Sequence, residues 1–406
     1  MFRRREERTL RTDSIDSPPP VSKRGEGGGR LTRRAFLGGS AVAGLAALYP
    51  GGVLGRGSLF AAAPKGEDPR FVAEARFYEK LPQSKIKCVL CPRECVIDHR
   101  ERGYCGVREN REGVYYTLVY SRPCTFHADP IEKKPFFHFL PSSLAFSLAT
   151  AGCNVNCKFC QNWDISQSRP EQLPAEYTPP AEVARLAKRH SCASIAYTYS
   201  EPVVFYEYMM DSAEAGRAAG LRNAIVTGGY IKPDPLREMC ARMDAIKVDL
   251  KAFTEDFYRD IVGGELRPVL DGLVTIRKAG VWNEIVYLVV PTLNDKDDEF
   301  RGLVRWIRTE LGPDVPLHFT RFHPQYLLQN LPPTPIATLE RAKAIADAEG
   351  LHYVYIGNVP GHPAENTNCP RCGNAVLTRA GFFVKEVRLR EGRCDRCDEP
   401  IPGVWS

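Results

Sequence analysis

The chain has 406 residues, of which 43% are hydrophobic, and its formal net charge is +6 at pH 7. This length provides ample material for a core of two or three domains. Residues 1–63 carry eleven of the basic and five of the acidic residues, so the remainder holds 44 of each and is neutral. That neutral remainder gives no indication of a surface that binds nucleic acid through its phosphates.

Residues 1–63 are predicted to be a targeting leader. An arginine-rich stretch is followed by the twin arginines Arg33 and Arg34, by a short apolar segment that ends at Leu48, and by three alanines at 61–63. This order is typical of a twin-arginine (Tat) signal, so we expect export or attachment to a membrane. The alternative is a cytoplasmic protein whose leader is inefficient or wrongly included in the reading frame.

Residues 64–140 are predicted to fold around a metal. Four cysteines occupy a stretch of only eighteen residues: Cys88, Cys91, Cys95 and Cys105. Thiols at this spacing are typical of a metal knuckle. The pattern favours zinc, which would stabilise a segment that has few apolar residues. The alternative is an auxiliary 4Fe-4S cluster that relays electrons.

Residues 141–360 alternate between strands and helices, which indicates parallel strands joined by crossover helices. About six such units fit a partial (β/α)6 TIM-type barrel, and the fold class is α/β. The predicted strands are 144–150, 193–199, 222–227, 244–250, 284–290, 317–322 and 353–356. The predicted helices are 179–189, 203–219, 235–242, 268–279, 297–311 and 337–349.

Three further cysteines follow the first of these strands, in the run AGCNVNCKFCQNW. Cys153, Cys157 and Cys160 have the spacing C-x-x-x-C-x-x-C, and small polar residues and Lys158 separate them. Three thiolates on one loop can hold three irons of a 4Fe-4S cluster, whereas an electron-carrying cluster normally takes four. One iron is then open to another ligand.

Residues 361–406 carry the third cysteine cluster. Two C-x-x-C pairs flank an alternating hairpin-like segment, which predicts a zinc-ribbon-like module in which four cysteines hold a structural zinc. The pairs are Cys369 with Cys372 and Cys394 with Cys397. A rubredoxin-like iron site is the alternative. The three remaining cysteines, Cys124, Cys192 and Cys240, are expected to be ordinary core residues.

The Cys153 loop resembles the signature of radical S-adenosylmethionine (SAM) enzymes, with Phe159 as the aromatic residue before its last cysteine. The resemblance implies that SAM binds the open iron through its amino and carboxylate groups. It also implies that one electron, from a flavodoxin- or ferredoxin-like donor, splits SAM into methionine and a 5'-deoxyadenosyl radical that abstracts hydrogen from a substrate. The family fold implies a splayed barrel that admits a macromolecule from the side.

Polar residues at the carboxyl ends of the predicted strands are expected to contact SAM, because chemistry in parallel barrels gathers there. Glu201 stands where the superfamily carries Gly-Gly-Glu-Pro, and it is expected to accept from the SAM amino group, although tyrosine and serine replace the two glycines. Thr227 and Gly228 end the next strand, where glycine allows a close approach to a ligand. A plain strand-to-helix turn is the alternative at that position.

Further SAM contacts are expected from four other residues of the barrel. Asp249 and Lys251 resemble the Asp-x-Lys element of glycyl radical activating enzymes, and an inward Lys251 would pair with the SAM carboxylate. The alternative is a lysine that reaches out to the rim. Phe159 would pack near the SAM adenine, or else form only the hydrophobic shell of the cluster. Of the histidines near 316–324, His323 is the first pocket candidate, because it lies nearest the end of its strand.

Several phrases narrow the resemblance to the group of pyruvate formate-lyase activating enzyme, and further to the radical SAM enzyme of the AmmeMemoRadiSam system. They include the Cys88 knuckle, DPIEKKPFFHFLP from Asp129 and VPTLND from Val290. The narrower resemblance implies a Memo-like partner protein. Activating enzymes of this group pass the radical to a glycine of a partner, so a protein substrate is one expectation, and a small-molecule substrate is the other.

Two classes of function follow from the sequence. The favoured one is a radical SAM enzyme that generates a 5'-deoxyadenosyl radical. The alternative is a non-catalytic electron-transfer or scaffold protein that holds iron-sulfur or zinc sites. The enzyme is favoured because it explains an open iron together with an alternating barrel and polar strand ends.

Overall fold

The computed structural model describes residues 68–406, and these residues lie within one compact unit. The Tat signal predicted for residues 1–63 lies outside the described residues. None of the helices in the described part of the chain is long and apolar enough to cross a bilayer.

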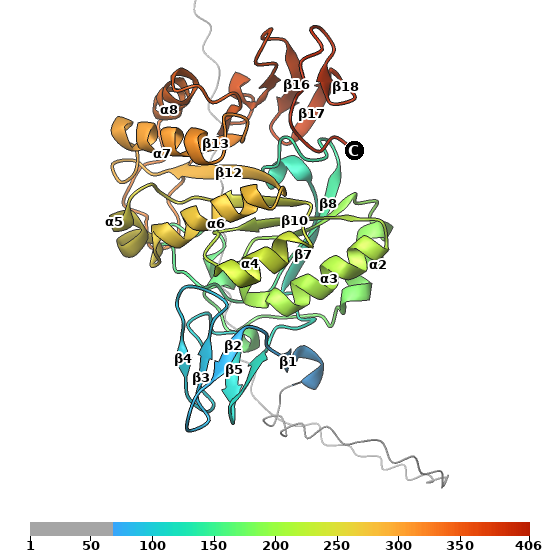
Figure 1. The fold of residues 1–406 in the computed structure, drawn as a ribbon, viewed down its shortest axis with the longest axis vertical. Coiled ribbons are helices and arrows are strands. Elements are labelled where there is room, and N and C mark those ends of the chain that lie inside the picture. Colours follow the sequence, from blue (N-terminus) through green and yellow to red (C-terminus); the bar gives the residue numbers. More distant parts are fainter. Residues whose placement is uncertain (1–67) are drawn as a thin grey trace, which may run out of the picture. The chain divides into compact units, whose positions relative to one another are not determined.

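An eight-stranded sheet forms the centre of the described chain, in the order β14-β13-β12-β11-β10-β9-β8-β7 (Figure 1). Every neighbouring pair from β8 to β14 is parallel, and β7 runs antiparallel to β8 at one edge. No ladder among the described residues joins β7 to β14, so the barrel is open, and the predicted partial barrel is confirmed. The strands are β7 (Thr125–Pro130), β8 (Leu144–Ala149), β9 (Ser194–Tyr197), β10 (Arg222–Thr227), β11 (Ala245–Asp249), β12 (Trp282–Val289), β13 (Leu317–Arg321) and β14 (Val354–Gly357).

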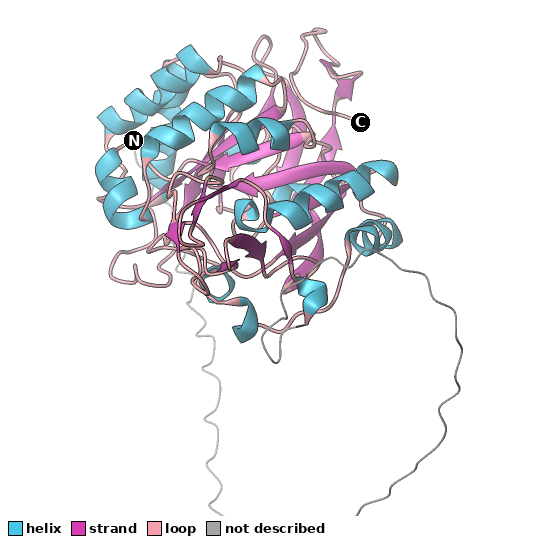
Figure 2. Ribbon diagram, turned by 60° about the horizontal axis from the view of Figure 1, so that its bottom comes forward, coloured by secondary structure: helices cyan, strands magenta, loops and turns pink. Residues whose placement is uncertain are grey.

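Helices connect the parallel strands and cover the outside of the sheet (Figure 2). In α7 the buried residues Phe300, Leu303, Val304 and Ile307 recur at i, i+3, i+4 and i+7, which gives the helix one apolar stripe to place against the strands. The helices are α1 (Trp163–Ser166), α2 (Pro180–Arg189), α3 (Tyr206–Ala218), α4 (Pro233–Cys240), α5 (Glu255–Phe257), α6 (Leu266–Lys278), α7 (Asp297–Glu310) and α8 (Ile336–Ala348). Shorter turns are η1 (Pro69–Phe71), η2 (Ile131–Lys133), η3 (Pro170–Gln172), η4 (Pro202–Phe205), the π-helical η5 (Tyr258–Val262) and η6 (Pro363–Glu365).

The parallel strands are buried on both faces, which explains their near-continuous apolar sequences. Every residue of β9, for example, is buried. Three charged or titratable side chains interrupt this pattern inside the barrel, namely Lys247, Glu284 and His318, and all three are buried. Buried charge of this kind needs partners. Lys247 finds its partner in the site described below, whereas Glu284 and His318 pair with each other.

Two small three-stranded sheets precede the barrel. One contains β1 (Ala73–Glu74), β6 (Val114–Thr117) and β5 (Arg108–Arg111), and the other contains β2 (Tyr78–Lys80), β3 (Ile86–Cys88) and β4 (Val96–Ile97). Their buried residues Ile86, Ile97 and Tyr115 belong to the same hydrophobic cluster as the barrel core. The region therefore packs directly on the barrel.

The C-terminal region forms short antiparallel strands at the end of the barrel opposite to β2–β5 (Figure 1). The predicted hairpin between the two cysteine pairs is present as β16 and β17. Val376, Leu377 and Ile401 pack with Phe137 and Tyr355, which anchors the region to the barrel. The strands are β15 (Thr367–Asn368), β16 (Ala375–Ala380), β17 (Phe383–Val387), β18 (Leu389–Arg390) and β19 (Arg393–Cys394).

Candidate active site and cysteine clusters

The loop that carries Cys153 begins directly after β8, and Gly152 makes its first turn possible. Gly152 has a φ of +96°, and a Cβ at this position would lie 2.5 Å from Cγ1 of Val107 and 2.7 Å from the carbonyl oxygen of Cys105. Glycine alone accepts both the positive φ and this close approach. The loop that carries Cys153 therefore packs closely on the N-terminal cysteine region.

Backbone hydrogen bonds and one side chain hold the rest of this loop. The N–H of Asn156 donates to the carbonyl of Val262 in η5 at 3.0 Å. The side chain of Asn162 donates to the carbonyl of Tyr199, just beyond β9, at 2.9 Å. The loop is therefore fixed to the carboxyl ends of two different parts of the barrel, where chemistry in such folds is located.

The three thiols of this loop are shielded from water. Cys157 is buried, whereas Cys153 and Cys160 are half-buried. Burial raises the pKa of Cys157 to about 12, and the ammonium of Lys251 offsets only part of this effect. Such thiols stay protonated at neutral pH until a metal takes the place of the proton. Three soft donors on one sheltered loop fit the open 4Fe-4S cluster predicted from the sequence.

The side chain of Glu201 contacts the end of β10. The carboxylate of Glu201 accepts from the hydroxyl of Thr227 at 2.6 Å and from the N–H groups of Gly228 and Val203 at 2.8 and 3.1 Å. Burial raises its pKa, although these three donors oppose the shift. A carboxylate offers about four acceptor positions, so one position stays free for another donor.

Asp249 and Lys251 form an ion pair at the end of β11, and the structure adds Lys247 to it. Asp249 lies 2.6 Å from Nζ of Lys247 and 3.0 Å from Nζ of Lys251. Burial alone would raise the pKa of the Asp249 carboxyl, but the two lysines hold this pKa below its ordinary range. Burial lowers the pKa of Lys251, yet Asp249 and Cys157 raise it overall. Burial lowers the pKa of Lys247, although Asp249 opposes the shift. Lys251 is therefore the residue that keeps a positive charge beside Cys157.

The other two predicted SAM contacts lie in different environments. Phe159 is buried, and its ring centroid lies 6.0 Å from that of Phe257. His323 lies two residues beyond β13 and is exposed. Their contacts with SAM stay predictions.

A second polar group at the site was not predicted. Lys134 is buried and donates to Asp129 at 2.5 Å and to the hydroxyl of Tyr199 at 3.0 Å. Burial lowers the pKa of Lys134 to about 8, with Asp129 opposing the shift. Tyr199 stands two residues before Glu201 and has a φ of +68°. The sequence signal was the lysine pair after Asp129, whose partner Tyr199 is remote in the chain.

Glu284 was also missed, and it holds together the opposite end of the barrel interior. Its fully buried carboxylate accepts from the N–H groups of Phe137 and His138 at 3.0 and 2.9 Å and from Nε2 of His318 at 2.8 Å. The carbonyl of Phe137 in turn accepts from Arg379 of the C-terminal region at 2.7 Å. Burial would raise the pKa of Glu284, but His318 and the other donors hold it at about 2. His318 is therefore a structural residue.

The C-terminal cysteines form a compact four-thiol site, as predicted. The ligand atoms of Cys369, Cys372, Cys394 and Cys397 all lie within 4.8 Å of one another. The sulfur atoms of Cys369 and Cys397 are 3.5 Å apart, and those of Cys372 and Cys394 are 3.7 Å apart. Thiolates at the corners of a tetrahedron around a single ion are about 3.8 Å apart, so the site fits one metal ion.

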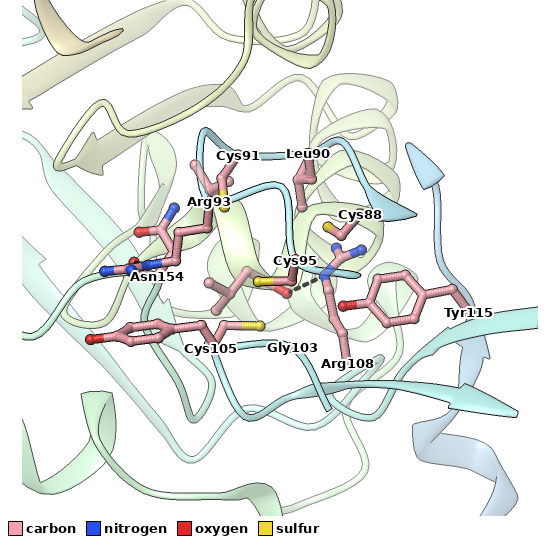
Figure 3. A pocket seen from close by; sticks show the side chains of 13 residues that line it. Cys88, Leu90, Cys91, Arg93, Cys95, Gly103, Cys105, Arg108, Tyr115 and Asn154 are labelled. Carbon is pink, nitrogen blue, oxygen red and sulfur yellow. Dashed lines mark hydrogen bonds between the residues drawn. The ribbon is translucent and has the colours of Figure 1, made fainter. Parts of the chain in front are cut away.

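The four N-terminal cysteines also come together, but around a cavity. Figure 3 shows Cys88, Cys91, Cys95 and Cys105 with their sulfur atoms around a common space, which all four residues line. Asn154, the residue after Cys153, lines the same space. The predicted metal knuckle is thus adjacent to the loop that carries Cys153.

Comparison with known proteins agrees with this site. The sequence profile of the radical SAM superfamily matches residues 147–307. The chain is 46% identical over 330 residues to "Uncharacterized protein MJ0808" of Methanocaldococcus jannaschii, which covers 81% of this chain and 98% of that protein. It is 26% identical over 164 residues to the pyruvate formate-lyase-activating enzyme of Clostridium pasteurianum, covering 39% of this chain and 66% of that enzyme. It is 23% identical over 215 residues to the pyruvate formate-lyase 1-activating enzyme of Escherichia coli, covering 49% of this chain and 87% of that enzyme.

The profile match begins within β8 and includes the three-thiol loop and the ends of β9, β10 and β11. These are the parts of the chain that bring Cys157, Glu201 and Lys251 to one edge of the sheet. The chain therefore belongs to the radical SAM superfamily of enzymes.

Proposed function

We propose that this radical SAM enzyme abstracts hydrogen from a partner protein, in the manner of a glycyl radical activating enzyme. The distant matches to pyruvate formate-lyase activating enzymes support this class of substrate. The observation that carries the SAM chemistry is the group of Lys247, Asp249 and Lys251 beside Cys157, in which Lys251 keeps its ammonium charge. By resemblance, Asp249 and Lys251 occupy the position of the Asp-x-Lys element of the activating enzymes.

The chain's own residues suit the two polar groups of SAM. Lys251 keeps its charge at neutral pH and is the candidate partner of the carboxylate, and the free acceptor position of Glu201 is the candidate partner of the amino group. The burial of Cys157 and Glu201 keeps water from this place. When bound and reduced by one electron, the cluster supplies the cleavage of SAM into methionine and a 5'-deoxyadenosyl radical.

A stacked aromatic pair near the cluster loop, of which Trp163 is exposed and Tyr326 half-buried, supports a substrate of peptide size. Trp163 and Tyr326 stack with centroids 5.3 Å apart and rings inclined by 10°. Trp163 is 44% exposed, and the neighbouring Leu327 is 59% exposed. The N–H of Leu327 donates to the carbonyl of Lys158, which ties this apolar surface to the loop between Cys157 and Cys160. Exposed apolar groups next to a site are typical of a surface that receives a partner.

Anaerobic reconstitution with iron and sulfide, followed by dithionite and SAM, tests the chemistry. We expect 5'-deoxyadenosine from the wild type and none above background from Cys157→Ala. Lys251→Met is expected to weaken SAM binding by about tenfold or more, because the carboxylate of bound SAM would lose its charged partner. The absorption spectrum should show that this variant still holds its cluster. Wild-type protein that holds its cluster and forms no 5'-deoxyadenosine would favour the non-catalytic alternative.

Deuterium transfer identifies the substrate. A Memo-like protein is the first partner to test, together with a flavodoxin- or ferredoxin-like reductant. Each candidate is labelled with deuterium, and the label in 5'-deoxyadenosine is measured by mass spectrometry. Label from a protein supports the proposal. Label from a small molecule alone overturns the proposed substrate class and leaves the SAM chemistry intact.

Two further sequence predictions belong to this proposal. Zinc is the proposed metal of the compact Cys369 site, and it is tested by metal analysis of the purified protein.

Export or membrane attachment through the Tat signal is the proposed location. Cell fractionation tests it, because full-length protein with an intact first residue found only in the cytosol would contradict it.

A further inference from the structure

The four N-terminal cysteines come from three separate pieces of chain. Cys88 ends β3, Cys91 and Cys95 lie on the loop before β4, and Cys105 lies on the loop before β5. The N–H of Cys88 donates to the carbonyl of Cys95 at 2.9 Å, which fixes the first piece against the second. All four side chains line one small space, a cavity of about 20 Å³ with room for about one water molecule (Figure 3).

Sulfur spacing separates the two kinds of metal that this site could hold. Four thiolates around one zinc ion are about 3.8 Å apart. Four thiolates of a 4Fe-4S cluster are roughly 6 Å apart, because each binds a different iron. In residues 68–406 the C-terminal four are the one group of three or more candidate ligands whose donor atoms all lie within 4.8 Å of one another. Within that described range, no three of the N-terminal sulfurs are that close, and neither are those of Cys153, Cys157 and Cys160.

The two other cysteine groups of the molecule can therefore be compared with the N-terminal group, one as a single-ion site and one as a cluster site. The compact C-terminal group has the spacing of a single ion, whereas the three sulfurs of the superfamily loop, which holds a cluster in that family, are not that close together in the described chain. The N-terminal group resembles the second.

Two buried donors face the same space without partners. Nη1 of Arg108 and the hydroxyl of Tyr115 are buried and make no hydrogen bond with the described residues. Both residues line the cavity with the cysteines, and Arg108 is only 1% exposed. The guanidinium of Arg108 is anchored by Glu207 at 2.5 Å and by the carbonyl of Val204 at 3.2 Å. Unpaired buried donors are costly, and inorganic sulfides would be acceptors for them.

We propose that Cys88, Cys91, Cys95 and Cys105 hold an auxiliary 4Fe-4S cluster, and that zinc, which the sequence favoured, is not their metal. The site lies beside the SAM-cleaving loop, since Asn154 lines its cavity and Gly152 packs against Cys105. Arg93 of the same region donates to the carbonyls of Asn154, at 2.5 Å, and of Gly263. Four protein ligands leave this cluster no open iron, so it binds no SAM and serves electron transfer.

Metal and sulfide analysis of the anaerobically reconstituted wild-type protein tests the proposal. The expected content per chain is about eight irons, about eight acid-labile sulfides and about one zinc. A content of about four irons, about four sulfides and about two zincs would overturn it. The assay needs neither SAM nor turnover, so its result is independent of the proposed function.

Variants assign the iron to its site. The triple variant C153A/C157A/C160A is expected to keep about four irons and, after reduction, an electron paramagnetic resonance signal of a 4Fe-4S cluster that SAM leaves unchanged. Absence of iron and of that signal from folded triple variant, judged by circular dichroism, would overturn the proposal. Cys105→Ser should lower the iron content of the wild type by about half, and Cys124→Ser is the matched control that should leave it unchanged.

Discussion

The N-terminal and C-terminal cysteine regions each present four thiols on short antiparallel strands and the loops between them, yet their sulfur atoms are arranged differently. The C-terminal sulfurs lie within 4.8 Å of one another, whereas those of the N-terminal region surround a cavity. In the C-terminal region, each C-x-x-C turn holds two of the four cysteines close together. The N-terminal cysteines are spread over three segments that are held by contacts with the barrel.

The difference shows that the number of thiols does not determine the kind of metal site. Arg108 enters the N-terminal cavity because Glu207 of α3 holds it from the barrel side. At the C-terminal site, Asn374 donates to Asp395 at 2.8 Å and bridges the two cysteine turns from nearby in the sequence. Contacts with the barrel shape the N-terminal cysteine site, whereas local turns bring the C-terminal cysteines together.

The largest expected effect comes from breaking the active site while both four-thiol regions stay intact. Cys157→Ala should reduce 5'-deoxyadenosine formation to background, because the SAM-binding cluster loses one of its three thiolates. The zinc content should remain at the wild-type level. Chromatography of the product and metal analysis of the same sample check both statements. Loss of zinc together with activity would show that the variant is misfolded rather than specifically inactive.

Removal of a ligand from the compact C-terminal site should have the next largest effect. Cys394→Ala should lower the free energy of unfolding by more than about 4 kcal/mol, since loss of a structural metal is among the few causes of changes of that size. Denaturant unfolding with metal analysis checks it. Cys240→Ala, which removes a buried thiol outside the clusters, is the control and should cost about 1 kcal/mol. Equal losses in the two variants would contradict a structural metal.

Acid should weaken the contact between the barrel and the C-terminal region. The folded state holds the pKa of Glu284 at about 2, below its ordinary 4.5. The unfolded chain therefore binds a proton first as the pH falls, and stability is lost between about pH 4.5 and 2, by about 3 kcal/mol in total. Urea unfolding at several pH values measures this. Glu284→Gln should be less stable at pH 7 and should flatten the pH dependence, and an unchanged slope would contradict the assignment.

The smallest effect tests the junction between the N-terminal region and the SAM-cleaving loop. Gly152→Ala should lower the free energy of unfolding by about 2–3 kcal/mol, because it combines a positive φ with a clash against Val107 and Cys105. Gly220→Ala is a matched control, since Gly220 has a φ of +75° and open space around it. Calorimetry should show a loss of about 1 kcal/mol for the control. Similar losses in both variants would mean that the packing at Gly152 is loose.

Much of the fold and part of the site could be predicted from sequence patterns. The barrel strands and helices follow from apolar periodicity, which is local, and the predicted elements correspond closely to β8–β14 and to the longer helices among α2–α8. Glu201, Thr227, Asp249 and Lys251 could be placed because they follow strands whose carboxyl ends must meet. The antiparallel β7 and the small N-terminal sheets were not predicted, because these strands are partly exposed or only two to four residues long and lack the near-continuous apolar runs of the buried parallel strands.

The sequence by itself determined that eleven cysteines fall into three groups with the spacing of metal ligands, because this spacing is a local property of the chain. That one group leaves an iron open stays a prediction. Only the tertiary structure decided how far apart the sulfur atoms of each group lie. It also decided that Lys247 joins Asp249 and that Glu284 holds Phe137 and His318. These features depend on contacts between residues that are distant in sequence, and such contacts exist only after the barrel has formed.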